Sequence, residues 1–180
     1  MIRILILSLL VNFWAANAQP ADHRQWTDVL QAYVSENGVV DYKGLQNNKS
    51  GLESYLKLLS ANAPNDEWST DAKKAYWINA YNAFTIQLIL KNYPLKSIKD
   101  LKRPWGQSFI KIDGGKIALN TIEHEILRPM GDPRIHFAIV CASKSCPKLL
   151  NYAYESETLD QQLEHVTKMF INDPSRNSIS

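Results

Sequence analysis

The sequence AYWINAYNAFTIQLIL, residues 75–90, is predicted to form the central helix of the fold. Ser69 or Thr70 is placed to cap its N-terminus, and Pro94 ends it. Apolar residues occur on almost every face, which is typical of a helix buried inside a domain. Asn79 and Asn82 lie three residues apart on one face, and buried amides need hydrogen-bond partners. They either organise neighbouring loops or line a site, where Asn79 orients a catalytic histidine and Asn82 contacts substrate.

Shorter elements are predicted on both sides of this helix. Asp113-Gly114-Gly115 is a turn sequence between two apolar runs and indicates a β-hairpin. A run of small and apolar residues, 135–141, is read as a buried core strand. Apolar residues at helical spacing predict further helices over 26–33, 45–59, 122–127 and 159–170. The order of elements predicts an α+β fold: a helix-rich single domain whose small antiparallel sheet, the hairpin plus one core strand, packs on the buried central helix.

The N-terminus has the features of a targeting segment. Arg3 precedes an apolar run that ends at a small-residue site, Ala16-Asn17-Ala18, so residues 1–18 are predicted to be a signal peptide. The mature domain then spans residues 19–180, and we expect an exported protein, periplasmic or secreted, with no stable membrane insertion after cleavage. The formal net charge of the whole chain is only +2, which gives no electrostatic reason to expect binding to nucleic acid.

The segment DPRIHFAIVCASKSCPKL, residues 132–149, holds both cysteines of the chain. Cys146 lies in a small-residue turn, where a thiol is accessible, whereas Cys141 ends the predicted strand. A cysteine nucleophile needs a nearby base, and the candidates are His124 and His136. We favour Cys146 with His124. Glu123 precedes His124 on the helix, and adjacent helix residues do not face each other, so direct orientation of His124 by Glu123 is not expected.

The predicted function is therefore a cysteine-dependent hydrolase or transferase acting on an amide, thioester or thiol, with a small-molecule or peptide substrate that the sequence does not identify. The candidate residues are Cys146, His124, Asn79, Cys141 and His136 for catalysis, and Asn82, Glu123, Arg134 and Ser145 for substrate binding.

Three alternatives use the same residues differently. A Cys141–Cys146 disulfide in an exported protein would be structural, and the protein would then be a non-catalytic binding module. In the second alternative the protein is a redox partner, and its two cysteines cycle between dithiol and disulfide. A zinc site built from the two cysteines with His124 and His136 does not match a common ligand spacing, so no metal and no cofactor is assigned.

Several motifs together resemble one known family. They are Gly38–Tyr42, Ala75–Ile86, Ile122–His124 and the long run Asp132–Pro147. On these motifs the chain resembles the family called domain of unknown function 547, which has no settled activity. Fusions of some members to thioredoxin-like domains imply thiol chemistry. The domain of relatives continues beyond a turn equivalent to residues 172–176, which implies that this chain is a C-terminally shortened member.

Overall fold

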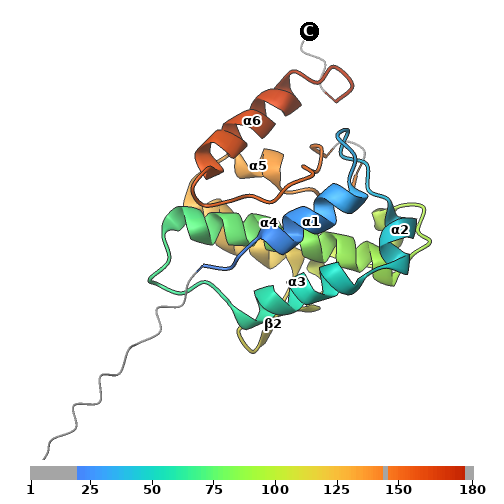
Figure 1. Cartoon of the computed structure of the whole chain (residues 1–180), viewed down its shortest axis with the longest axis horizontal. Helices are drawn as coiled ribbons and strands as arrows, with labels where there is room; N and C mark the ends of the chain where they lie inside the picture. The colour runs from blue at the N-terminus through green and yellow to red at the C-terminus, as the bar shows by residue number, and fades with distance from the viewer. Residues whose placement is uncertain (1–19, 144–145, 177–180) are drawn as a thin grey trace, which may run out of the picture.

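The fold is built around the long helix α4 (Thr70–Lys91), which crosses the middle of the molecule (Figure 1). The computed structural model describes residues 20–143 and 146–176. The Ser69 hydroxyl accepts a hydrogen bond from the backbone N–H of Ala72 at 3.1 Å, which confirms the predicted N-cap. Tyr76 and Ile78 lie on opposite sides of α4 and both are fully buried. The prediction of a central buried helix is therefore confirmed.

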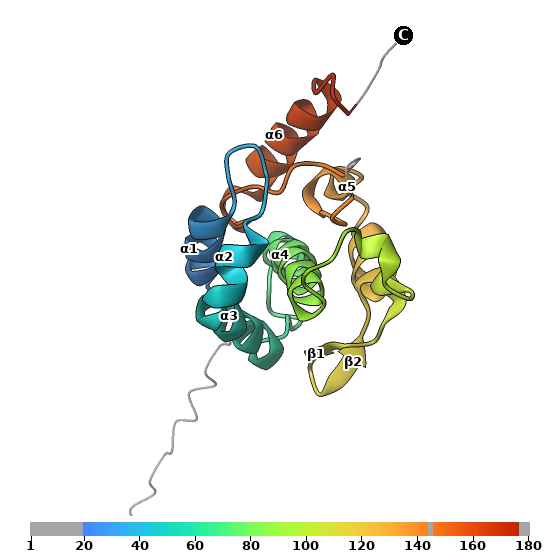
Figure 2. The same ribbon diagram turned by 90° about the vertical axis from the view of Figure 1, so that its right-hand side faces the viewer.

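Three helices cover one side of α4 (Figure 2): α1 (Arg24–Tyr33), α2 (Tyr42–Asn47) and α3 (Ser50–Ala61). Trp26 of α1 stacks on Tyr55 of α3, with ring centroids 5.3 Å apart. The helix predicted over residues 45–59 is wrong in one respect, because it is two helices. Asn48 ends α2 with φ −139°, outside the helical region, and the chain restarts as α3 two residues later.

The small sheet is a two-stranded antiparallel hairpin of β1 (Ile110–Ile112) and β2 (Gly115–Ile117). Asp113 and Gly114 connect the strands with φ values of 51° and 69°, and two successive left-handed residues make the turn that suits hairpin twist. Two short 3₁₀ turns, η1 (Ile98–Asp100) and η2 (Pro104–Gly106), join α4 to the hairpin. The helix-rich α+β class with a small antiparallel sheet is confirmed.

The second half of the chain differs from prediction at the core strand. Ile135–Ala138 is the short helix α5, and Ile139 after it is extended. The prediction of a strand over residues 135–141 is therefore wrong. The remaining elements are the π-helix η3 (Thr121–Leu127), the 3₁₀ turn η4 (Arg128–Met130) and the amphipathic helix α6 (Leu159–Ile171).

Some predictions concern parts of the chain that the structure does not describe. Residues 1–18, the predicted signal peptide, and Ser145, a predicted substrate contact, lie outside the described residues. Export and the single domain over residues 19–180 stay predictions. Over residues 20–143 and 146–176, we find no helix with the length and apolarity needed to cross a bilayer.

Candidate active site

The Glu123 carboxylate lies between two histidines. Its Oε1 atom is 4.0 Å from Nδ1 of His124 and 4.0 Å from Nδ1 of His136. Glu123 and His124 belong to η3, whereas His136 comes from α5, so the packing of these two short helices creates the cluster. The Glu123 side chain is 18% exposed, and the two histidine side chains are 46% and 42% exposed. We call these three residues the Glu–His cluster; its carboxylate is sheltered and its two imidazoles are open to solvent.

Two further groups fix the carboxylate of the Glu–His cluster. Arg128 donates a hydrogen bond from Nη2 to Glu123 Oε1 at 3.2 Å. From the buried side, the Tyr81 hydroxyl on α4 lies close to Glu123. Burial raises the pKa of Tyr81, and the charge of the neighbouring Glu123 carboxylate raises it further, so Tyr81 stays a neutral donor. The carboxylate is thus fixed within ion-pair range of both imidazoles, 4.0 Å from each Nδ1 atom.

The expectation was that Glu123 and His124, as neighbours on a helix, would not face each other; their side chains lie within ion-pair range, 4.0 Å apart, without a hydrogen bond. That expectation assumed an α-helix, but residues 121–127 form a π-helix. A π-helix has more residues per turn, so consecutive side chains point in more similar directions than they do on an α-helix. Short π-helical segments are frequent at functional sites, which is consistent with a site here.

Cys141 and Cys146 form a disulfide with an Sγ–Sγ distance of 2.05 Å and Cα atoms 6.2 Å apart. Their exposure is the reverse of the prediction: Cys146 is buried, at 8% exposure, whereas Cys141 is half-buried. Arg176, which follows α6, donates a hydrogen bond to the Cys146 carbonyl oxygen. The turn therefore does not present Cys146 to solvent. Among the described residues neither cysteine is a free thiol.

A cavity of about 180 Å³ lies beside this disulfide loop, between α4 and the two segments 38–42 and 140–149. Ala142 and Ser143 of the loop contribute to its wall, together with Tyr42. Burial raises the pKa of Tyr42 to about 12, so its hydroxyl is neutral. Ala142 has φ +59°, a left-handed conformation that costs a non-glycine residue about 1 kcal/mol. Strained residues of this kind occur preferentially at functional sites.

Asn79 and Asn82 both bind backbone. The Asn79 amide donates to the carbonyl of Tyr154 at 2.8 Å and accepts from the N–H of Tyr154 at 3.0 Å. The Asn82 amide donates to the carbonyl of Ala138 at 3.0 Å and accepts from the N–H of Val140 at 2.8 Å. Both amides hold loops against α4. Asn82 also lines the cavity beside the disulfide loop, and the predicted roles of Asn79 and Asn82 in the site stay predictions.

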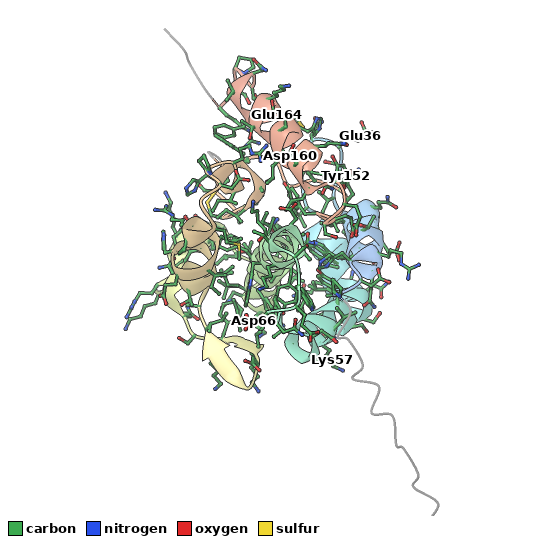
Figure 3. The ribbon with its side chains drawn as sticks, turned by 90° about the vertical axis from the view of Figure 1, so that its left-hand side faces the viewer. Glu36, Lys57, Asp66, Tyr152, Asp160 and Glu164 are labelled. Atoms are coloured by element: carbon green, nitrogen blue, oxygen red, sulfur yellow. A yellow bond between two sulfur atoms is a disulfide. The ribbon has the colours of Figure 1, made fainter. Side chains whose placement is uncertain are left out.

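Arg134 belongs to an ion-pair network. Its guanidinium donates to Asp132 at 3.0 Å and to Asp160 on α6 at 2.8 Å. Asp160 lies one turn from Glu164 on the same helix, as Figure 3 shows, and Glu164 is 3.9 Å from Arg134. The buried Lys74 of α4 contacts Asp132 at 3.0 Å. Arg134 therefore ties α5 to α6, and its predicted contact with substrate stays a prediction.

The structure brings together Glu123, His124 and His136 among the predicted site residues. Arg128 and Tyr81 were missed as members of the cluster. A hydroxyl between two buried amides on α4 was the available signal for Tyr81, because an apolar helix does not bury a polar atom without a partner. Residues 20–143 and 146–176 contain no group of three His, Cys, Asp or Glu side chains arranged to hold a metal ion.

Comparison with known proteins places the chain in a family. Residues 65–171, more than half of the chain, match the family described as protein of unknown function, DUF547. The chain belongs to this family. No curated protein and no solved structure matches it. The matched region of the DUF547 family begins just before α4 and includes the Glu–His cluster, the disulfide loop and both buried amides.

Proposed function

We propose that the protein is a hydrolase or transferase that acts on an amide or thioester substrate. The observation that carries the proposal is the Glu–His cluster, in which one sheltered carboxylate lies 4.0 Å from the Nδ1 atoms of two accessible histidines. With Nδ1 facing a carboxylate, the Nε2 atom of His124 or His136 is available to take and return a proton. Imidazoles are suited to this because their ordinary pKa lies near neutral pH.

The nucleophile in this proposal is a thiolate released from the Cys141–Cys146 disulfide. A dithiol reductant supplies the two electrons that convert the disulfide to two thiols. Cys141 is the better candidate, because it is the more exposed cysteine and borders the cavity-lining residue Ala142. The Cys141 thiolate attacks the substrate carbonyl carbon and forms a thioester, while a histidinium donates its proton to the leaving amine or thiol. Water or a second acceptor then takes the acyl group and restores the thiol.

A second candidate is a non-catalytic binding module, and specific contacts favour it. The disulfide is formed, Cys146 is buried with its carbonyl bonded by Arg176, and both buried amides hold backbone. In that case the Cys141–Cys146 bridge clamps a loop of the binding surface. It would add about 2 kcal/mol of stability, because it closes only a short loop.

Alkylation of the native protein distinguishes the proposed enzyme from the binding module. The protein is reduced without denaturant and labelled with iodoacetamide from pH 5 to 9, and the labelled peptides are quantified by mass spectrometry. The proposed enzyme predicts that Cys141 labels fast below pH 7, because a histidinium stabilises its thiolate. His124→Gln, His136→Gln or Glu123→Gln should slow labelling at pH 6 at least fivefold.

The matched control is His165→Gln, since His165 is exposed on α6 and absent from the cluster. Labelling that occurs only after unfolding, or at the rate of a free thiol in all four variants, would refute the enzyme and favour the binding module.

A further inference from the structure

A groove of about 560 Å³ lies between α3, α4 and β1; Figure 2 shows α3 and β1 below the central helix α4, on its two sides. Its apolar surface comes from Leu56 of α3, Phe84 of α4 and Phe109 just before β1. Phe84 and Phe109 meet edge to face, with ring centroids 6.3 Å apart. This volume is in the range of small-molecule sites in proteins, and none of the groove residues belongs to the Glu–His cluster.

Three lysines surround the apolar surface: Lys57 on α3, Lys91 at the end of α4 and Lys111 on β1. All three are exposed, and across the described ranges no carboxylate forms an ion pair with any of them. The ammonium of Lys91 lies 5.5 Å from the centre of the Phe109 ring, so one positive charge is held directly at the aromatic surface. Glu53 is the acidic residue among those that line the groove.

The surrounding sequence adds to this positive charge. Residues 91–116 contain six lysines and one arginine against two aspartates, although the whole chain carries a net charge of only +2. Positive charge is thus concentrated in this segment, from which Lys91, Phe109 and Lys111 line the groove. Such a field attracts anions and raises their local concentration near the lysines.

We propose that this groove binds an amphiphilic carboxylate, a molecule with an aliphatic or aromatic body and one carboxylate group. The body packs on Leu56, Phe84 and Phe109, and the carboxylate lies among the three lysines. Apolar burial supplies the affinity, and the charge sets the preference for an acid over a neutral molecule of the same shape. This inference is independent of the function proposed above, because it uses a separate surface.

The test is a titration of the ¹⁵N-labelled protein with decanoate below its micelle concentration, followed by NMR. Decanol offers the same chain without charge, and acetate offers the charge without the chain. The proposal predicts saturable shifts at Phe84, Phe109 and Lys91 with decanoate, and at least tenfold weaker binding of decanol and of acetate.

The double variant Lys91→Gln/Lys111→Gln should weaken decanoate binding at least fivefold. Lys43→Gln on α2 is the control, because Lys43 is exposed and does not line the groove. The three lysines are all exposed, and thermal unfolding verifies that the double variant and the control are folded. The proposal is overturned if decanol binds as tightly as decanoate, if the double variant binds decanoate unchanged, or if saturable shifts occur away from the groove or not at all.

Discussion

Replacement of Asn79 by leucine tests the role of the buried amides. Asn79 is fully buried and satisfies both the N–H and the C=O of Tyr154. Leucine has the same number of side-chain heavy atoms and a similar branched shape, but it leaves both backbone groups buried without a partner. Each unsatisfied group costs about 1–3 kcal/mol, so Asn79→Leu should lower the free energy of unfolding by about 2–6 kcal/mol. Since small proteins are stable by only about 5–15 kcal/mol, the variant should be severely destabilised.

The measurement is urea unfolding followed by tryptophan fluorescence. Asn92→Leu is the control, because Asn92 is exposed at the end of α4 and donates one hydrogen bond to its own helix. We expect its unfolding free energy to change by less than about 0.5 kcal/mol. The Asn82→Leu variant should resemble Asn79→Leu. A loss below about 1 kcal/mol for Asn79→Leu would show that water or a backbone shift satisfies Tyr154, and the scaffolding argument would be wrong.

Three other changes have defined outcomes. Asp132→Asn removes the charge that pairs with Arg134 and with buried Lys74, and it should cost about 3 kcal/mol in urea unfolding at pH 7. Hydrogen bonds from Arg134 and then from Lys74 lower the pKa of Asp132, so the wild type should lose this contribution as the pH falls below about 4. Burial lowers the pKa of His23 from 6.5 to about 4, so protons bind the unfolded chain first and stability should fall by about 3 kcal/mol between pH 6.5 and 4. His23→Gln, which does not titrate, should remove that part of the pH dependence, and an unchanged profile would contradict the argument. Gly38→Ala should lower the thermal midpoint more than Gly114→Ala; both glycines have positive φ, but at Gly38 an added methyl carbon would lie 2.9 Å from a backbone nitrogen, whereas at Gly114 it would contact nothing.

Local signals in the sequence were enough to predict the helix α4 and the β-hairpin. A capping serine, a long apolar run and a following proline define a helix at any position in a fold, and a turn with left-handed residues defines a hairpin. The run 135–141 has no such local signal, because a short apolar segment suits a buried strand or a buried helix equally. Its conformation depends on Asn82, which lies more than 50 residues earlier and binds Ala138 and Val140 as a neighbouring strand would.

The sequence predicted which residues belong to the candidate site better than it predicted how they are arranged in space. The sequence singles out Glu123, His124 and His136, because ionisable groups next to apolar runs need partners. Their grouping depends on the π-helical geometry of η3 and on the packing of α5 against it, and neither follows from residue spacing. The exposure of the two cysteines was reversed for a similar reason. Arg176, distant in sequence, donates a hydrogen bond to the carbonyl of Cys146, and no local pattern near the turn indicates this contact.

The two buried side-chain amides of α4 have a consequence for amide hydrogen exchange in the loops that they hold. The N–H groups of Val140 and Tyr154 lie outside regular secondary structure, where amide protons normally exchange with solvent within minutes. Here each N–H group donates a hydrogen bond to a side chain of the buried helix α4, so it can exchange only when that helix separates from its neighbours. Their deuterium uptake should therefore be as slow as that of α4 itself. Slow exchange at these two positions would report the opening of the whole core.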